Sequence, residues 1–247
     1  MAVPSEHGGR IALVTGANTG IGLATCRALA RAGMTVVLGA RSPGRGAAAV
    51  EQLRAEGLGV ELLVIDVVDD ASVTSAAGWI GERFGRLDVL VNNAAVKEEF
   101  HPSAPSETSL DVVRRTFETN VLGTIRVIQA MLPWLRRSPA GRVVNVSSTL
   151  GSLTRSGDER SPQHPVTLLG YSTSKSAINA VTVQFANELR ASGITVNAVD
   201  PGSVATPMNP RAVRTPDEAV GPIIRLLMTG PDGETGGFFD EGGPVPW

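Results

Sequence analysis

The chain has 247 residues, of which 42% are hydrophobic and 19% charged, and its formal net charge is −2. This charge, spread without a basic stripe, excludes electrostatic binding of nucleic acid, and the single cysteine, Cys26, excludes an internal disulfide and a multi-cysteine site, so no metal is expected. No apolar run approaches membrane-spanning length and the first ten residues are polar, so we expect a cytoplasmic protein without membrane contact.

Short apolar runs typical of buried strands alternate with helical patterns along the chain. This alternation predicts an α/β fold, a doubly wound parallel sheet of about seven strands with helices on both faces. The strands are expected at residues 11–15, 35–39, 60–64, 88–92, 142–147, 194–199 and 237–239. The helices are expected at residues 21–32, 45–56, 72–84, 110–136, 171–191 and 215–228. No linker or repeat divides the chain, which predicts a single domain over residues 1–247 with a polar tail at residues 1–9.

A glycine-rich turn follows the first strand and precedes the first helix. It reads Thr15-Gly-Ala-Asn-Thr-Gly-Ile-Gly22, with the spacing G-x-x-x-G-x-G. Backbone N–H groups placed in this way can approach a pyrophosphate at the positive end of the helix, which predicts a dinucleotide-binding turn. Glycines that only close a tight turn for packing are the alternative. The cofactor-binding residues expected here are Gly16, Asn18, Thr19, Gly20, Ile21 and Gly22.

The residues after the second strand indicate which dinucleotide is bound. Ala40 stands where a carboxylate that bonds the ribose 2′-hydroxyl would be expected, and Arg41 follows it directly. A guanidinium group without a competing carboxylate favours a 2′-phosphate. We therefore expect NADP(H) as the cofactor, bound by Arg41, with Ser42 and Arg45 as possible further contacts. The alternative is that Arg41 is only a surface cation.

Tyr171 is the only tyrosine of the chain, and Lys175 is one of only two lysines among 22 lysine and arginine residues. On a helix, positions i and i+4 lie on one face. An ammonium group in that place can lower the pKa of a phenol from about 10, which makes the tyrosine a proton donor and acceptor near neutrality. The alternative is a half-buried tyrosine beside a solvated lysine.

Together with four further segments, these patterns resemble the short-chain dehydrogenase/reductase family. The resemblance extends from about Arg10 to Trp247 and implies a Rossmann-type fold. The glycine turn matches the dinucleotide turn of the family. The other matches, all in family order, are Asn92-Asn93-Ala94-Ala95 (with Ala95 where glycine is usual), Asn120 in T-N-V-x-G, Ser148 in S-x-x-G, Tyr171-x-x-x-Lys175 and Pro201-Gly202-x-x-x-Thr206.

The resemblance implies hydride transfer between a nicotinamide and a carbonyl or alcohol carbon. Tyr171 would donate or accept the proton, and Lys175 would lower the phenol pKa and bond the nicotinamide ribose. Ser148 would donate a hydrogen bond to the carbonyl oxygen, and Asn120 would hold a water that links Lys175 to solvent. Ser147 receives no catalytic role, because only Ser148 has a glycine three residues later. From the residues alone, Asn120 could instead satisfy local backbone.

The same resemblance adds cofactor-binding residues beyond the glycine turn. Asp66, at the end of the third strand, would bond the adenine, although a lone carboxylate at a strand end could equally cap the following loop. The full set that the resemblance adds is Asp66, Val67, Asn93, Ala94, Ala95, Tyr171, Lys175, Pro201, Gly202, Val204 and Thr206.

Two irregular stretches, residues 149–170 and 202–214, leave from carboxyl ends of strands and are expected to shape a substrate pocket. The interval of 23 residues between Ser148 and Tyr171 is long for the family, and the second stretch is short. This exchange of lengths resembles the carbonyl-reductase-like branch of the family. We expect residues 155–170 to form one wall of the pocket and residues 202–214 to leave the other side open.

The predicted function is NADPH-dependent reduction of a small-molecule ketone or aldehyde to an alcohol, with Tyr171 as the proton donor. One alternative is an enzyme of the same fold that acts on an imine, an alkene or an alcohol. Another is a non-catalytic NADP-binding sensor or scaffold, although the tyrosine, lysine and serine are intact. A homo-oligomer is expected rather than a monomer, because family members commonly pair through the long helices.

Overall fold

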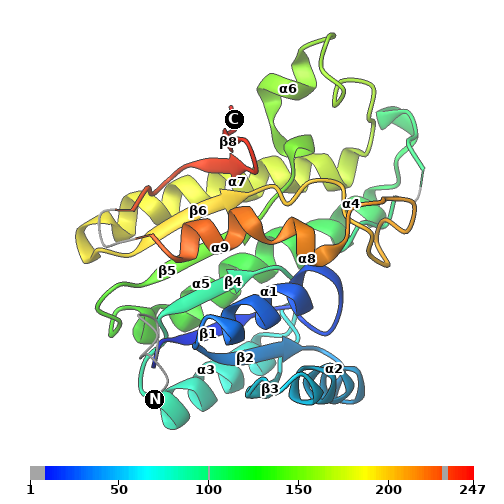
Figure 1. The fold of residues 1–247 in the computed structure, drawn as a ribbon. Helices are drawn as coiled ribbons and strands as arrows, with labels where there is room; N and C mark the ends of the chain where they lie inside the picture. The colour runs from blue at the N-terminus through cyan, green and yellow to red at the C-terminus, as the bar shows by residue number, and fades with distance from the viewer. Residues whose placement is uncertain (1–8, 100, 230–232) are drawn as a thin grey trace.

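The computed structural model describes residues 9–99, 101–229 and 233–247, so the expected polar tail lies outside the described residues apart from Gly9. The described chain forms a sheet of eight strands with the order β3-β2-β1-β4-β5-β6-β7-β8 (Figure 1). All strands are parallel except β8, which runs antiparallel to β7. The strands are Ile11–Val14 (β1), Thr35–Ala40 (β2), Val60–Val64 (β3), Val89–Asn92 (β4), Arg142–Val146 (β5), Thr195–Val199 (β6), Phe238–Asp240 (β7) and Gly243–Pro244 (β8). The seven expected strands are confirmed, and β8 adds a short eighth at one edge.

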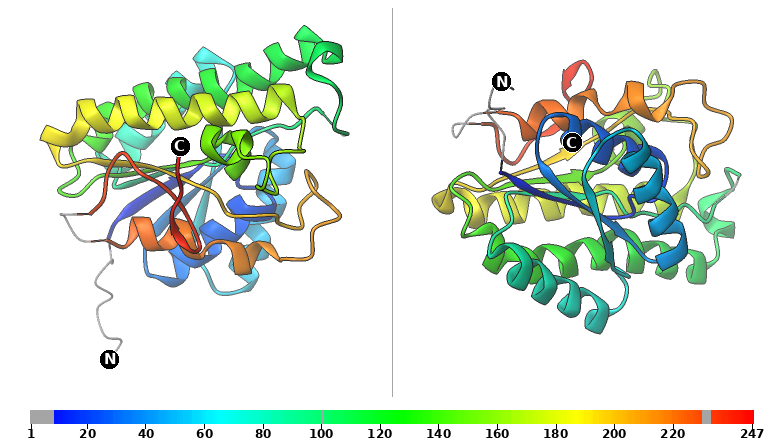
Figure 2. Two further views of the ribbon diagram at one scale, coloured as in Figure 1. Left: turned by 90° about the horizontal axis from the view of Figure 1, so that it is seen from above. Right: turned by 60° about the horizontal axis from the view of Figure 1, so that its bottom comes forward.

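Helices cover both faces of the sheet, as the alternating pattern predicts (Figure 2). One face packs against α3, α5 and α7, and the opposite face packs against α1, α2 and α9. The helices are Gly20–Arg31 (α1), Pro43–Ala55 (α2), Asp70–Phe84 (α3), Leu110–Phe117 (α4), Gly123–Leu135 (α5), Leu153–Gly157 (α6), Leu169–Leu189 (α7), Pro216–Ala219 (α8) and Gly221–Leu227 (α9).

The central strands are buried from both sides because helices cover both faces of the sheet. All four residues of β1 and all five of β6 are buried, which is typical of parallel strands in doubly wound folds. Aliphatic side chains dominate both cores; Leu13 and Leu90 face one layer of helices, and Val14 and Val91 face the other. This packing holds the carboxyl ends of the strands together at one edge, from which the functional loops leave.

The helix expected at residues 110–136 is not uniform. Helix α4 passes into a π-helical segment, Glu118–Leu122, before α5 begins. A π-helical turn accommodates an extra residue and occurs frequently at functional sites. This one contains Asn120, which is 1% exposed and bonds outside its own helix. Ordinary helical periodicity does not reveal such an insertion.

The helix expected at residues 215–228 is likewise divided, into α8 and α9. Helix α8 begins with a capping box between Thr215 and Glu218. Pro222 stands in the first turn of α9 and has no N–H to donate to the preceding turn, so the two helices do not join. Short α6 lies within the stretch that we expected to be irregular.

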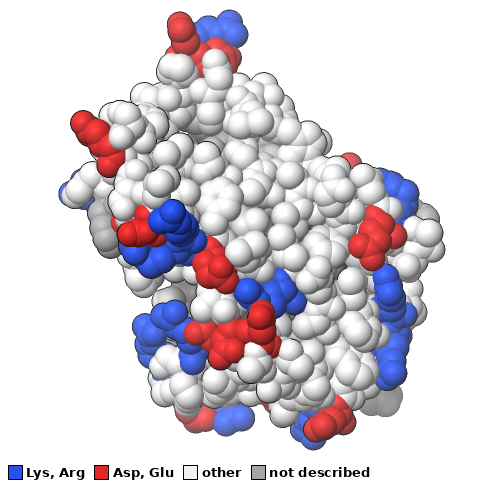
Figure 3. All heavy atoms as spheres, turned by 180° about the vertical axis from the view of Figure 1, so that it is seen from behind, with Lys and Arg blue, Asp and Glu red and all other residues white. Residues whose placement is uncertain are grey.

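Among the described residues, no helix combines the length and apolar character needed to cross a membrane. In the same part of the chain, no three His, Cys, Asp or Glu side chains gather where they could hold a metal ion. Figure 3 shows the face opposite to that of Figure 1, where basic and acidic side chains lie in small mixed groups. The described part of this face offers no extended cationic surface to a polyanion.

Candidate active site

A cavity of about 1430 Å³ lies at the carboxyl ends of the strands. Its walls come from the loops that follow β1 to β6, which the parallel order brings to one edge of the sheet. The strand order reverses between β1 and β4, and doubly wound sheets bind ligands at such a switch point. Every site residue predicted from the sequence lines this cavity except Gly22 and Asn120.

The glycine turn packs against the segment after β4 with no room for side chains. Gly16 has a φ of 61°, and a Cβ atom there would lie 2.7 Å from Cα of Ala94. A Cβ atom on Gly22 would lie 2.5 Å from Nδ2 of Asn93, which itself donates to the carbonyls of Thr15 and Gly16 at 3.0 Å each. Gly22 does not line the cavity; its lack of a side chain lets Asn93 pack against the turn. The turn leaves a cradle in front of α1 that fits a pyrophosphate.

The end of the cavity beside β2 and β3 is basic. Arg41 and Arg45 both line it, and Ser42 Oγ caps α2 by accepting a hydrogen bond from the N–H of Arg45 at 3.4 Å. Two guanidinium groups beside the N-terminus of a 13-residue helix form a donor set that fits a phosphate. The residues present at this end are therefore those that a 2′-phosphate requires.

Asp66 lies next to this basic end, in the loop after β3. Its Oδ1 accepts a hydrogen bond from the N–H of Val68 at 3.2 Å, and its own N–H donates to Ser72 Oγ at 2.9 Å. These bonds show that Asp66 caps its own loop, which is the alternative that the sequence left open. Because the residue also lines the cavity, its contact with an adenine stays a prediction.

The serine loop after β5 is held against α7 by a close steric contact. A Cβ atom on Gly151 would lie 2.6 Å from the carbonyl carbon of Lys175. Only glycine permits this approach, and it is the physical reason for the glycine three residues after Ser148. The contact brings Ser148 to the helix that carries both Tyr171 and Lys175.

The two neighbouring serines have different surroundings. Ser148 begins the 3₁₀ turn Thr149–Gly151, and its Oγ accepts a hydrogen bond from the N–H of Leu150 at 3.3 Å. Ser147 is buried and donates to Oδ1 of Asn179, on α7, at 2.6 Å. Ser147 therefore joins the end of β5 to α7, while Ser148 forms a hydrogen bond with the phenol of Tyr171.

Lys175 is buried almost completely, with 2% of its surface exposed. Its Nζ donates to the carbonyl of Val146 at 2.8 Å and lies 5.5 Å from the centroid of the Tyr171 ring. Desolvation lowers the pKa of Lys175 to about 8, against the opposing effect of Asp200. The ammonium form is still the majority form at neutral pH, and it lies next to the ring of Tyr171.

Burial, reinforced by the charge of Asp200, raises the pKa of Tyr171 to about 12, and the hydrogen bond with Ser148 acts in the opposite direction. Our expectation that Lys175 would hold this pKa below its ordinary value is therefore wrong in this structure. Desolvation of the phenolate is the largest contribution to this rise. The phenol remains protonated at neutral pH, which suits it to donate a proton.

Asn120 does not line the cavity but holds the loop that does. Its Nδ2 donates to the carbonyl of Val96 and to Ser174 Oγ, both at 3.0 Å, and its Oδ1 accepts from the N–H of Val96 at 2.8 Å. Asn120 thus connects the loop after β4 to α7. Both N–H groups of the amide are occupied by these bonds, and the water-holding role that the resemblance implies stays a prediction.

Sequence reasoning missed two buried carboxylates at this site. Asp200, 7% exposed, accepts a hydrogen bond from the N–H of Gly202 at 2.9 Å and lines the cavity. Its position just before Pro201-Gly202 was a signal that could have revealed it. Glu99, also 7% exposed, accepts hydrogen bonds from the N–H groups of Gly170 and Tyr171. No local pattern joins Glu99 to residues that lie more than seventy positions later.

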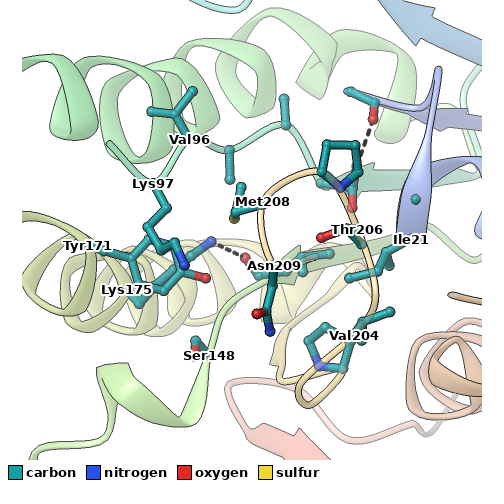
Figure 4. A pocket seen from close by; sticks show the side chains of 18 of the residues that line it. Ile21, Val96, Lys97, Ser148, Tyr171, Lys175, Val204, Thr206, Met208 and Asn209 are labelled. Atoms are coloured by element: carbon teal, nitrogen blue, oxygen red, sulfur yellow. Dashed lines mark hydrogen bonds between the residues drawn. The ribbon is translucent and has the colours of Figure 1, made fainter. Parts of the chain in front are cut away.

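Both irregular stretches line the cavity. The expected wall at residues 155–170 is present, through Arg155, Pro162, Gln163, Val166 and Leu168. The expectation that residues 202–214 leave the other side open is wrong, because residues 203, 204 and 206–211 also line it. Isolated bridges between Val204 and Arg214 and between Thr206 and Asn209 fold this short loop back on itself. Figure 4 shows it opposite Tyr171 and Lys175.

Known proteins similar to this chain are oxidoreductases. The family model described as short chain dehydrogenase matches residues 10–217. The ketoacyl reductase of the monensin polyketide synthase from Streptomyces virginiae is 41% identical, over 82% of this chain and 73% of its own length. Carbonyl reductase [NADPH] 1 from Sus scrofa is 35% identical, over 96% of this chain and 94% of its own length.

Solved structures agree in the same way. The NADPH-bound carbonyl reductase from chicken fatty liver has a TM-score of 0.85 and 28% identity, with 97% of this chain and 100% of that chain covered. The actinorhodin polyketide ketoreductase with NADPH has a TM-score of 0.80 and 29% identity, with 96% of each chain covered. The chain therefore belongs to the short-chain dehydrogenase/reductase family of oxidoreductases and is similar to its carbonyl-reductase-like branch.

Proposed function

We propose that this chain reduces a ketone or an aldehyde to an alcohol with NADPH, and that Tyr171 is the proton donor. The observation that carries this proposal is the protonated phenol of Tyr171, hydrogen-bonded with Ser148 and backed by buried Lys175 in one cavity. The NADPH-bound carbonyl reductase and ketoreductase among its structural neighbours support the same reaction.

The residues around the cavity fit NADPH along its length. The N–H groups of the glycine turn would hold the pyrophosphate, and Arg41 would pair with the 2′-phosphate. Lys175 would bond the nicotinamide ribose, and Val204 and Thr206 would hold the carboxamide. When bound there, NADPH supplies the hydride for the carbonyl carbon. The remaining steps belong to side chains of this chain.

Charge develops on the carbonyl oxygen as the carbon is reduced. Ser148 and Tyr171 each present a hydroxyl group to that oxygen, and hydrogen bonds aimed at developing charge lower the barrier. The proton of Tyr171 then passes to the alkoxide, which is a stronger base than a phenolate. The transfer leaves an alcohol and a phenolate that Lys175 stabilises until solvent replaces the proton.

The protonation state of Tyr171 suits the reductive reaction. Burial raises its pKa to about 12, so the phenol is present as the acid at neutral pH and needs no prior proton uptake. In the reverse reaction the phenolate would act as the base. The concentrations of the cofactor forms and of the substrates set the net direction.

The test is a cofactor-consumption assay with NADPH and with NADH over ketones, aldehydes, quinones, imines and alkenes, with identification of the products. We expect NADPH consumption matched by alcohol formation. Reduction of imines or alkenes without reduction of any carbonyl compound would contradict the proposed substrate class. If fluorescence shows NADPH binding but no compound is turned over, the enzyme hypothesis is wrong and a non-catalytic sensor is favoured.

A homo-oligomer and a single domain over residues 1–247 also stay predictions. Sedimentation equilibrium measures the first directly. Cooperative unfolding followed by two independent probes, tyrosine and tryptophan fluorescence and circular dichroism, measures the second, because one domain unfolds in one coincident transition.

A further inference from the structure

The two lysines of this chain line the same cavity. All other cationic side chains except histidine are arginine, yet Lys97 and Lys175 both border the site of the proposed reaction. Lys175 has a role in that reaction, whereas Lys97 has none. Figure 4 shows Lys97 extending from the loop after β4 on the same side of the pocket as Tyr171 and Lys175.

The charge of Lys97 has no counter-charge within the described protein. Its ammonium group forms no ion pair or hydrogen bond with any residue that the structure describes, although the residue is half-buried. The adjacent carboxylate, Glu98, pairs with Arg115 at 2.6 Å. The ammonium group of Lys97 is not fully buried and the residue lines the cavity, so an anionic group of a ligand can pair with it there.

The other charged groups at this end are either engaged or exposed to solvent. Arg155 pairs with Asp240 at 3.2 Å, and Asp200 accepts a hydrogen bond from the N–H of Gly202. Arg211, which also lines the cavity, is exposed to solvent on the short loop. Lys97 is therefore the cation that is both beside the catalytic helix and available to a ligand among the described residues.

The position of Lys97 is fixed by its loop. Val96, its neighbour, exchanges two hydrogen bonds with the side chain of Asn120. A cation whose backbone is held in this way loses less entropy on binding than one on a mobile loop. The cavity that Lys97 borders also has apolar lining residues, among them Val96, Leu150, Pro162, Val166, Leu168 and Met208.

We infer that Lys97 binds a carboxylate on the substrate, so that the preferred substrates are keto acids with an apolar body. This inference rests on the proposed carbonyl reduction and adds the substrate class to it. The carbonyl lies at Tyr171 and Ser148, the apolar body contacts the walls, and the carboxylate pairs with Nζ of Lys97. The product is the corresponding hydroxy acid.

The experiment compares keto acids with their methyl esters, which keep the carbonyl and remove the charge. Benzoylformate, 3-benzoylpropionate and 4-benzoylbutyrate, each with its ester, vary the distance between carbonyl and carboxylate. The measured quantity is the acid-to-ester ratio of kcat/KM, for the wild type, Lys97→Met and, as a matched control, Arg211→Met. NADPH affinity, followed by fluorescence, reports that each variant is folded.

For at least one pair, we expect the wild type to favour the acid roughly tenfold or more, as a charge-assisted hydrogen bond provides. Lys97→Met should bring that ratio to about one, with the loss mainly in KM for the acid, while Arg211→Met should keep it. A wild type that reduces the esters but favours no acid overturns the inference and leaves the proposed function standing. If only Arg211→Met loses the preference for the acid, Arg211 and not Lys97 binds the carboxylate, and the inference is overturned. A wild type that reduces neither acids nor esters, nor any other carbonyl compound, overturns the proposed function.

Discussion

The carboxylate of Glu99 caps the helix that carries Tyr171. Its Oε2 accepts a hydrogen bond from the backbone N–H of Tyr171 at 2.8 Å, and its Oε1 accepts one from the N–H of Gly170 at 3.1 Å. Leu168, at the N-cap position of α7, provides no side-chain cap of its own. A negative charge at a helix N-terminus is favourable, so a residue from the loop after β4 positions Tyr171, the proposed proton donor.

Removal of this cap should weaken both the fold and the reaction. We expect Glu99→Ala to lower the free energy of unfolding by about 1–2 kcal/mol, because two helix N–H groups lose their acceptor. It should also lower kcat more than it changes KM. Glu99→Gln, which keeps one acceptor, should recover part of both losses. Urea unfolding and steady-state kinetics measure these effects, and Glu98→Ala, at a partly exposed ion pair, is the matched control. Equal effects of the 98 and 99 substitutions would contradict the capping role.

Tyr171→Phe keeps the ring and removes only the hydroxyl group. NADPH binding, followed by fluorescence, should survive, while kcat falls at least about hundredfold, as expected for loss of a general acid. Near-normal turnover would rule out the proton-donor role and, with it, the roles proposed for Ser148 and Lys175.

Arg41→Asp should reverse the cofactor preference. The substitution removes a charge-assisted bond to the 2′-phosphate and places repulsion there, while a carboxylate can bond the free ribose hydroxyl of NADH. The measurement is the ratio of kcat/KM for NADPH and NADH. Arg54→Asp makes the same change of charge near the far end of α2, where Arg54 pairs with Glu51, and should leave the ratio unaltered. An Arg41→Asp enzyme with the wild-type ratio would show that another residue selects the cofactor.

The buried lysine makes stability depend on pH. Lys175 releases its proton near pH 8 in the folded chain and near pH 10.5 in the unfolded chain. Between these values the unfolded state binds more protons, so stability rises with pH. The raised pKa of Tyr171 acts with the opposite sign, but only from pH 10 to about 12. From pH 8 to pH 10 we expect Lys175 to contribute a rise of about 2 kcal/mol, which Lys175→Met removes. Parallel stability profiles of the two proteins in urea would contradict this.

Shortening the segment at residues 158–164 to a tight turn should change substrate preference and KM, while NADPH affinity stays near that of the wild type. The segment contributes Pro162 and Gln163 to the cavity, and Gln163 Nε2 donates to Thr149 Oγ1 at 3.3 Å. The chain on the N-terminal side of the segment has an anchor of its own, because Ser152 Oγ donates to the carbonyl of Pro246 at 2.6 Å. An unchanged profile across a carbonyl panel would show that the segment is a surface feature.

The order of the elements was predictable because each is encoded locally. A strand buried on both faces reads as a continuous apolar run, as at β1, and a glycine-rich turn between a strand and a helix is typical of dinucleotide binding. The glycine turn, Asn93, Ser148 and Pro201-Gly202 could be placed for the same reason, since each lies within a few positions of a strand end. Asn120 and the pair Tyr171 and Lys175 lie on helical segments and were found by motif spacing alone.

What could not be predicted depends on contacts between distant segments. Glu99 reaches α7 across some seventy positions, and the π-helical turn at Asn120 changes the hydrogen bonding of the backbone without altering the apolar pattern. The pKa of Tyr171 was misjudged because spacing reveals a neighbouring lysine but not the depth of burial. The fold of the short loop at residues 203–211 comes from bridges that its length does not indicate.

The contact between Gly151 and Lys175 allows one part of this enzyme to vary while another part stays fixed. The long segment after the contact can change, whereas Ser148, Tyr171 and Lys175 keep their relative positions. The contact joins the serine loop to α7 so closely that a side chain at position 151 would overlap the backbone of Lys175. The long segment that lines the cavity starts only after this junction and returns to α7 before Tyr171. Insertions, deletions and substitutions within that segment can therefore remodel substrate recognition while the distance between Ser148, Tyr171 and Lys175 is kept. An engineered change of specificity in this scaffold should start there and leave Gly151 untouched.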